Sequence, residues 1–291
     1  MYTMRPQSFE YHRPETLDEA LDLLGSVEES RPLAGGHSLL PMMKLRLATP
    51  AALVDIGRVP GLAEIGRDGD EVTIGALATH GAIASSREVR EACPVLAETA
   101  ALVGDRQVQN RGTIGGSVAH ADPSADYPTL LRALGGTIVV RGRDGERRIS
   151  ADDFFVDVFT TALAPGELVT AVTVPATTAK GLGAMYLKHR HPASSYAVVG
   201  VAAVVGANGS VTEAALAIGG VAGKPVRVEA AREMLVGQQP DEAAITAVAD
   251  AVGKSIDGAI GDTYASGEYR VHLAKVMSKR AIAAAVERAR V

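Results

Sequence analysis

Residues 32–41 read Pro-Leu-Ala-Gly-Gly-His-Ser-Leu-Leu-Pro, and residues 111–126 read Arg-Gly-Thr-Ile-Gly-Gly-Ser-Val-Ala-His-Ala-Asp-Pro-Ser-Ala-Asp. Each stretch places a Gly-Gly pair between β-compatible residues and a small hydroxyl, Ser38 or Ser117. Adjacent glycines let the backbone turn sharply and bring successive N–H groups to one side, as a concave anion-binding nest. Alone, either pair is equally well read as a simple turn. Together they predict two loops that hold a diphosphate from both sides.

The common nucleotide motifs are absent from the sequence. A dinucleotide-binding G-x-G-x-x-G would start at Gly181, but Tyr186 stands where its third glycine belongs. A phosphate-binding G-x-x-x-x-G-K-[ST] would end at Gly253-Lys254-Ser255, but Val248 replaces its first glycine. The paired glycine stretches are therefore the main candidate for a nucleotide site.

Composition narrows the class of protein. The 291 residues are 47% hydrophobic and 22% charged with a net charge of −5, which is typical of a globular chain with no basic nucleic-acid surface. The single cysteine, Cys93, excludes an internal disulfide and any iron–sulfur or zinc site built from several thiolates, and we interpret it as a packed residue. The longest apolar runs, such as 196–205, are too short to span a bilayer, and residues 1–6 offer no apolar leader. We expect no metal site and a cytoplasmic location.

Hydrophobic periodicity and turn signals divide the chain into three expected domains. Residues 1–57 form a βαβ-type lobe, with a helix capped by a box of Thr16 and Glu19 and stopped at Gly25. Residues 58–176 form a mixed middle lobe, which includes a hairpin about Arg143-Asp144-Gly145. Residues 177–291 form an α+β domain of three antiparallel strands packed against helices near 241–256 and 268–289.

The two glycine stretches resemble the flavin loops of the molybdenum-hydroxylase FAD subunits, and among these the medium chains of aerobic carbon monoxide dehydrogenases. Residues 9–14 (Phe-Glu-Tyr-His-Arg-Pro) and 219–227 (Gly-Gly-Val-Ala-Gly-Lys-Pro-Val-Arg) extend the resemblance over nearly the whole chain. It implies an α+β fold: a two-lobed FAD-binding domain of the PCMH type (VAO-like), followed by a C-terminal domain of the CO dehydrogenase flavoprotein type. Ser117 departs from the asparagine that many relatives carry, which alters a hydrogen bond without removing a donor.

The resemblance also implies which residues bind the cofactor, and it assigns no catalytic residue to this chain. The implied contacts of the FAD pyrophosphate are Ala34, Gly35, Gly36, His37 and Ser38 with Thr113, Ile114, Gly115, Gly116 and Ser117. Asp126 would bind polar groups of the cofactor, and His120 would contact either the ribityl chain or the protein. Lys188 and Tyr196 are candidates for the isoalloxazine side; the alternative is a surface lysine and an aromatic side chain packed in the core.

In this family the chemistry is divided among chains. The implied partners are a large molybdopterin subunit and a small subunit with two [2Fe–2S] clusters, assembled as a dimer of heterotrimers that lies in the cytoplasm or at the inner face of the membrane. One alternative keeps FAD but serves a hydroxylase of purines, N-heterocycles, nicotine or aldehydes. Others are a non-enzymatic assembly or sensor protein that retains the fold, and a standalone flavin oxidase.

Overall fold

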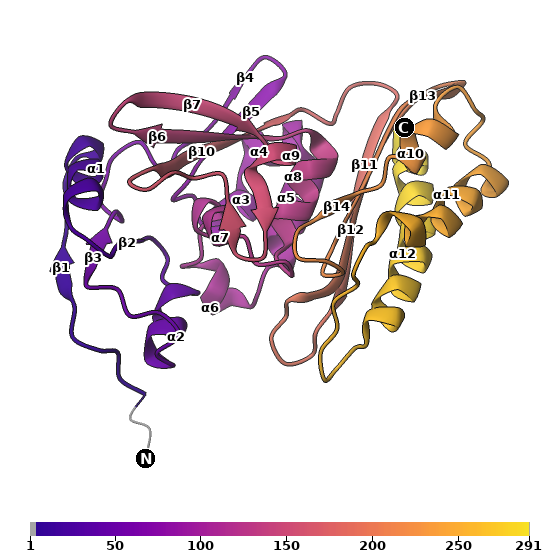
Figure 1. Ribbon diagram of the computed structural model, residues 1–291. Coiled ribbons are helices and arrows are strands. Elements are labelled where there is room, and N and C mark those ends of the chain that lie inside the picture. Colours follow the sequence, from indigo (N-terminus) through magenta and orange to yellow (C-terminus); the bar gives the residue numbers. More distant parts are fainter. Residues whose placement is uncertain (1–3, 291) are drawn as a thin grey trace.

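The computed structural model describes residues 4–290. Residues 1–3, which are part of the stretch 1–6 where we expect no apolar leader, lie outside the described residues. Three sheets of three or more strands follow one another along the described residues, in residues 10–55, 65–175 and 182–227. In Figure 1 the first lies at the left in indigo, the second in the centre and the third at the right. Among the described residues, no helix is long and apolar enough to cross a bilayer.

The first sheet is parallel, in the order β1-β3-β2. Its elements are β1 (Glu10–His12), α1 (Leu17–Ser26), β2 (Ser30–Leu33), α2 (Leu39–Lys44) and β3 (Ala52–Asp55). Thr16 caps α1 as predicted, by accepting the Glu19 N–H at 3.1 Å. The return bond of the capping box is different, because the Glu19 carboxylate accepts from the N–H of Glu15 instead of Thr16. The helix also runs past the predicted stop at Gly25 to Ser26, where Val27 caps it.

The middle sheet is antiparallel, in the order β4-β5-β10-β6-β7. Its strands are β4 (Ile65–Asp68), β5 (Glu71–Gly75), β6 (Thr137–Gly142), β7 (Gly145–Ser150) and β10 (Leu168–Pro175). The helices of this region are α3 (His80–Ser85), α4 (Arg87–Ala92), α5 (Pro94–Leu102), α6 (Arg106–Gln109), α7 (Ile114–His120), α8 (Asp126–Leu134) and α9 (Ala151–Phe154). A small hairpin of β8 (Phe155–Asp157) and β9 (Thr160–Thr161) stands apart from the sheet. The predicted hairpin at residues 143–145 is confirmed as the β6–β7 turn.

The C-terminal sheet has one more strand than expected. Its antiparallel order is β11-β12-β13-β14, and the fourth strand is only two residues long. The elements are β11 (Leu182–Arg190), β12 (Ala197–Asn208), β13 (Ser210–Gly219), β14 (Val226–Arg227), α10 (Ala230–Leu235), α11 (Glu242–Ser255) and α12 (Gly267–Ala289). Two residues are too few to produce a period-2 pattern, so the sequence offered no signal for β14.

The strand β12 is buried on both faces and joins two cores. Val199 and Val201 pack with the helices α10–α12, whereas Ala202 and Val204 pack into the core of the middle region, where β12 contacts α8. Strands covered on both faces read as continuous apolar runs, as this one does. Cys93 is fully buried in the middle core, and burial raises the pKa of its thiol to about 11, which confirms it as a packed residue.

Candidate functional site

A cleft of about 880 Å³ lies where the first and middle regions meet, within the size range of ligand sites. Its lining includes residues 29–33 and 47–50 of the first region, 103–104 of the middle region and 194–196 of the C-terminal region. Most of the predicted cofactor residues line it: Ala34, Gly35, Gly36, His37, Ser38, Thr113, Gly115, Gly116, Ser117, His120, Asp126 and Tyr196. Ile114 and Lys188 do not.

The first glycine stretch is a loop, as predicted. It connects β2 to α2, and Gly36 adopts a φ of +74°, a left-handed conformation that favours glycine. Within residues 4–290, the N–H groups of residues 35–38 have no hydrogen-bond acceptor in the protein. A side chain at Gly35 would overlap the carbonyl oxygen of Arg111, so the two glycine stretches touch through their backbones. The loop thus offers free N–H donors in the lining of the cleft.

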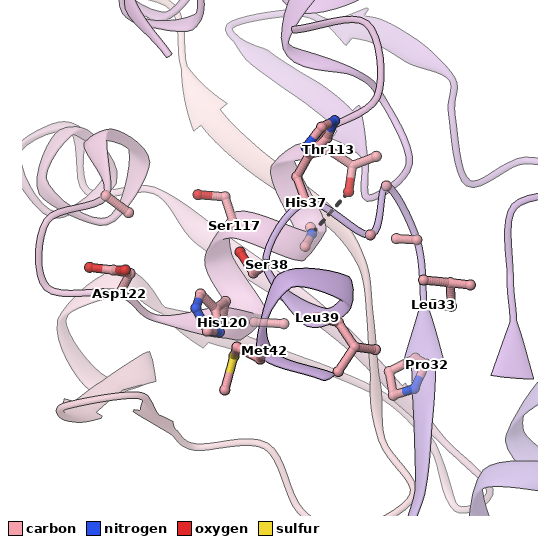
Figure 2. Close-up of a pocket in the computed structure, with 18 of the residues that line it drawn as sticks. Pro32, Leu33, His37, Ser38, Leu39, Met42, Thr113, Ser117, His120 and Asp122 are labelled. Carbon is pink, nitrogen blue, oxygen red and sulfur yellow. Dashed lines mark hydrogen bonds between the residues drawn. The ribbon is translucent and has the colours of Figure 1, made fainter. Parts of the chain in front are cut away.

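The second glycine stretch is not the predicted loop but the first turn of α7. Thr113 caps this helix by accepting the N–H of Gly116 at 3.2 Å, the contact drawn in Figure 2. The N–H groups of Ile114 and Gly115 bond the carbonyl oxygens of Ala78 and Ala76, at 3.1 and 2.9 Å. These donors are therefore already used, and no anion nest forms here. A threonine before small residues is also typical of a helix N-terminus, but the loop was predicted from the Gly-Gly pair alone.

Two positions of α7 face the cleft. The Cβ of a residue at Gly116 would meet only Thr113 Oγ1, at 2.9 Å, whereas one at Gly115 would meet the Ala76 carbonyl oxygen at 2.7 Å. Gly115 is therefore required for packing, whereas a side chain at Gly116 would crowd only the Thr113 hydroxyl within 4 Å. Ser117 follows with its hydroxyl toward the cleft (Figure 2). The side chain of Ile114 is fully buried in the core, so the structure gives it a packing role in place of the predicted contact.

His80 lines the cleft and was missed by the sequence reasoning. It is 4% exposed at the start of α3, and its Nδ1 lies 3.1 Å from the hydroxyl of Tyr127. Burial, with a smaller contribution from His37, lowers the pKa of His80 to about 4. Its Nε2 would lie 2.6 Å from a Cβ at Gly112, so this neutral ring packs directly behind the second glycine stretch. The only sequence signal was the Thr79 cap before it.

His120 ends α7 and forms part of the cleft wall. Its ring centroid lies 4.9 Å from that of Phe159, at the tip of the β8–β9 hairpin. Burial lowers the pKa of His120, against an opposing effect of Asp122. Figure 2 shows its ring beside Met42 of α2 and close to Ser38. Of the two expected roles, the structure supports the contact with protein directly.

Asp126 and Lys188 form a buried ion pair. Lys188 Nζ lies 2.7 Å from Asp126 Oδ2, and the hydroxyl of Tyr186 donates to Asp126 Oδ1 at 2.7 Å. Burial raises the pKa of Asp126, opposed by Lys188 and then Tyr186. Lys188 also donates to the carbonyl oxygen of Leu102, at 3.1 Å. The lysine is thus neither at the surface nor in the cleft lining, but directly behind Asp126.

Tyr196 stands at the rim of the cleft, immediately before β12. It is 41% exposed, so it is not the core-packed aromatic of the alternative interpretation. Partial burial raises the pKa of its phenol, with a further contribution from Asp122, and a hydrogen bond with Ser38 opposes the rise. The C-terminal region thereby reaches the first glycine loop. Among the residues that the structure describes, no group of three or more His, Cys, Asp or Glu side chains could hold a metal ion.

Comparison with known proteins identifies the family. Residues 7–177 match the model of the FAD binding domain in molybdopterin dehydrogenase, and residues 184–285 match the CO dehydrogenase flavoprotein C-terminal domain. The chain belongs to the FAD-binding medium subunits of the molybdenum hydroxylase family. It is 38% identical to the carbon monoxide dehydrogenase medium chain of Afipia carboxidovorans, over 99% of this chain and 100% of that one. It is 36% identical to the nicotine 6-hydroxylase medium subunit of Paenarthrobacter nicotinovorans, over 96% and 98%.

The solved structures agree with this membership. Carbon monoxide dehydrogenase from Hydrogenophaga pseudoflava, in a form lacking the Mo-pyranopterin moiety, contains a chain that superposes with a TM-score of 0.94. The identity is 40%, and the match covers 98% of this chain and 99% of that one. The expected α+β fold and the FAD cofactor of this oxidoreductase subunit are confirmed. The cleft, the free donors of the first loop and the lack of a side chain at Gly116 fit a dinucleotide with a central diphosphate.

Proposed function

We propose that this flavoprotein is the electron-transfer subunit of a carbon monoxide dehydrogenase. It would take electrons from the two [2Fe–2S] clusters of a small partner subunit and pass them to an external acceptor. The observation that carries the proposal is the glycine-lined cleft in a chain 38% identical, over its whole length, to a carbon monoxide dehydrogenase medium chain. Bound FAD suits this task because a flavin exchanges electrons singly or in pairs.

The donor pattern of the cleft supports a specific seat for the diphosphate. The N–H groups of residues 35–38 would donate to its oxygens, as would the hydroxyl of Ser117. Gly116 would allow the diphosphate to approach α7 closely, since no side chain fills that space. Neutral N–H and O–H donors would therefore bind the charged phosphate oxygens. A hydrogen bond to an ionised acceptor is stronger than one between two neutral groups.

We place the isoalloxazine end of the cofactor toward residues 103–104 and Tyr196. Asp126 also lines the cleft, and Lys188 forms an ion pair with it. Lys188 would then influence the flavin through the position and charge of Asp126 instead of by direct contact. Carbonyl oxygens at this end are also fixed from the C-terminal sheet, where Lys188 binds Leu102 and Arg190 binds Gly104.

The substrate of the complex would be set by its molybdenum-containing partner subunit and not by this chain. Relatives of similar identity are named for nicotine hydroxylation and for glyceraldehyde dehydrogenation, at 36% and 37%. Those classes, with purines and other N-heterocycles, are the second candidate function. Carbon monoxide is favoured because the solved structure with the TM-score of 0.94 is a carbon monoxide dehydrogenase.

The proposed assembly contains a large molybdopterin subunit and the small [2Fe–2S] subunit, as a dimer of heterotrimers. Cys93, the one cysteine of the chain, is buried, so the clusters must reside elsewhere. We place the complex in the cytoplasm or, through its partners, at the inner face of the membrane. We further propose that the chain has domains at residues 1–57, 58–176 and 177–291, a division that the separation of the three larger sheets supports.

Co-purification from native cells tests the proposal. We expect two further chains, molybdenum, iron and one FAD per copy of this chain, with the flavin bleached by carbon monoxide under anaerobic conditions. Bleaching by a purine, nicotine or an aldehyde, but not by carbon monoxide, would establish the second candidate. A chain that holds FAD but is never reduced by a cluster-bearing partner would support the assembly or sensor alternative and overturn both.

A further inference from the structure

One exposed aromatic side chain of the cleft has no role in the function described so far. Phe159 lies at the two-residue tip of the β8–β9 hairpin, and its side chain is 55% exposed. Its ring nevertheless packs on His120, with the centroids 4.9 Å apart and the planes inclined at 40°. It therefore forms part of the cleft wall at the end of α7.

The backbone of Phe159 is in an unfavourable conformation for this residue type. Its φ is +50°, in the left-handed region that asparagine and glycine adopt more readily than a bulky residue. Turn geometry therefore does not explain a phenylalanine here, and core packing does not either, because the ring is half exposed. Bulky residues held in such conformations occur most often at ligand sites, where the side chain has a task.

The surroundings of this ring suit a flat, uncharged group. His120 is a neutral imidazole at ordinary pH, because burial lowers its pKa. Met42 adds a thioether beside it, as Figure 2 shows. Aromatic rings attract one another at centroid separations of about 4.5–7 Å, and sulfur also packs well on them.

The C-terminal segment 219–227, one of the stretches that resemble the family, packs against the β8–β9 hairpin. A Cβ at Gly223 would lie 2.7 Å from Asp157 Oδ1 and 2.8 Å from Val158 Cγ2, so this segment packs tightly against the hairpin tip. The N–H of Gly220 binds the carbonyl oxygen of Pro123, at 2.8 Å, in the tail of the second glycine stretch. One segment thus contacts both structures that meet at the His120–Phe159 pair.

We propose that Phe159 is an aromatic cover for a flat ring of the bound FAD, and that segment 219–227 holds this cover in place through the hairpin tip. The proposal rests on FAD binding in the cleft. The ring is either the adenine or the isoalloxazine, which share the same stacking chemistry.

Titration of the full chain with FAD tests the cover. We expect Phe159→Leu to raise the Kd for FAD about two- to tenfold, the factor that corresponds to one aromatic pair. Phe159→Tyr should restore the wild-type Kd. Phe9→Leu, an exposed phenylalanine outside the cleft lining, is the matched control and should change nothing.

Phe159→Asn separates binding from folding. Asparagine tolerates a φ of +50°, so the melting temperature of the FAD-free chain should stay the same or rise while the Kd for FAD increases. A lower melting temperature of the FAD-free Phe159→Asn chain together with a higher Kd for FAD would mean a merely structural role and would overturn the proposal. So would unchanged FAD binding in Phe159→Leu. If the wild-type chain binds FAD but is not reduced by partners, the proposed function fails and this inference stands.

Competition with FMN and with ADP identifies the ring. Weaker binding of FMN alone in Phe159→Leu places the cover on the isoalloxazine, and weaker binding of ADP alone places it on the adenine. Either result supports a cover. Equal binding of both ligands by wild type and variant overturns it.

A double-mutant cycle tests the role of segment 219–227. Gly223→Ala should weaken FAD binding by displacing the hairpin tip, and this effect should largely vanish in the Phe159→Leu background, since both changes would act through the same ring. Gly66→Ala is the control, because a Cβ there meets nothing within 4 Å and its φ is ordinary. Additive effects of Gly223→Ala and Phe159→Leu would show that the segment acts elsewhere.

Discussion

Lys188 Nζ lies 2.7 Å from Asp126 Oδ2, with the two side chains only 3% and 4% exposed. This pair joins β11 of the C-terminal sheet to the first residue of α8, and Asp126 is also part of the cleft wall. The carboxylate oxygens of Asp126 already have donors in Lys188 and Tyr186. The C-terminal region is therefore attached to the cofactor site through a buried charge.

Replacing Lys188 by methionine should destabilise the protein strongly. The change would leave the Asp126 carboxylate buried without its cation, which typically costs about 3–5 kcal/mol of unfolding free energy. Denaturant unfolding of the FAD-free chain measures this loss. Lys180→Met, at an exposed lysine of the linker, is the control and should stay within about 0.5 kcal/mol of wild type.

The double variant Lys188→Met with Asp126→Asn should recover much of that loss, since the buried charge is then gone. Equal stabilities of the Lys188 and Lys180 single variants would contradict this account of the ion pair.

Sequence reasoning predicted the family, the cofactor and most of the cleft, because these depend on local patterns. Each Gly-Gly pair lies within two residues of its own serine, Ser38 or Ser117, and all of these residues line the cleft. The position of Lys188 depends on a pairing with Asp126 across 62 residues, which no local pattern encodes. His80 and Phe159 escaped notice for the same reason: their partners, Tyr127 and His120, are distant in the chain.

The second glycine stretch illustrates a different kind of error. Two readings competed for residues 113–117, a turn made by adjacent glycines and a helix begun by a threonine cap. The helix prevails because Ala76 and Ala78 accept the N–H groups of Gly115 and Ile114, which a short peptide in isolation could not satisfy. Tertiary contacts thus decided between two local preferences.

Gly36→Val should abolish FAD retention. Valine is strained at a φ of +74°, and a Cβ would meet Leu40 Cδ1 at 2.9 Å, so the loop that offers free N–H donors must change shape. Gly61→Val is a matched control: its φ is +80°, its surroundings are open, and it lies outside the cleft lining. Both variants should lose about 1–2 kcal/mol of stability, whereas flavin absorbance of the purified protein should be lost only in Gly36→Val. Stoichiometric FAD in Gly36→Val would remove the loop from the site.

Gly115→Ala and Gly116→Ala should have opposite consequences, although the two glycines are adjacent. The methyl group at Gly115 would collide with Ala76, which should lower the melting temperature markedly. The methyl group at Gly116 would lie 2.9 Å from Thr113 Oγ1, so only this hydroxyl must shift, and alanine favours a helix. The melting temperature should therefore fall less than in Gly115→Ala, while FAD binding weakens at least tenfold. Thermal unfolding without FAD and titration with FAD separate the effects. Normal FAD affinity in Gly116→Ala would place the diphosphate away from α7.

His80 should make the stability of the FAD-free chain depend on pH. Its pKa is about 4 in the folded protein, because burial disfavours the charged ring, against an ordinary value of 6.5. As the pH falls below 6.5 the unfolded chain takes up this proton first, so stability contributed by the neutral ring is present above that pH. It is lost as the pH falls from 6.5 toward 4 and amounts to on the order of 3 kcal/mol in total.

Denaturant midpoints of wild type and His80→Gln between pH 4 and 8 isolate this contribution, because the carboxylates titrate in both proteins. Glutamine keeps a polar group near the hydroxyl of Tyr127 but cannot take up a proton. The stability difference between the two proteins should be constant above about pH 7 and shift toward the variant as the pH falls, by the amount that the pKa change implies. A difference that is the same at pH 5 and pH 8 would mean that His80 is protonated equally in the folded and unfolded chains, and would contradict its burial as a neutral ring behind the second glycine stretch.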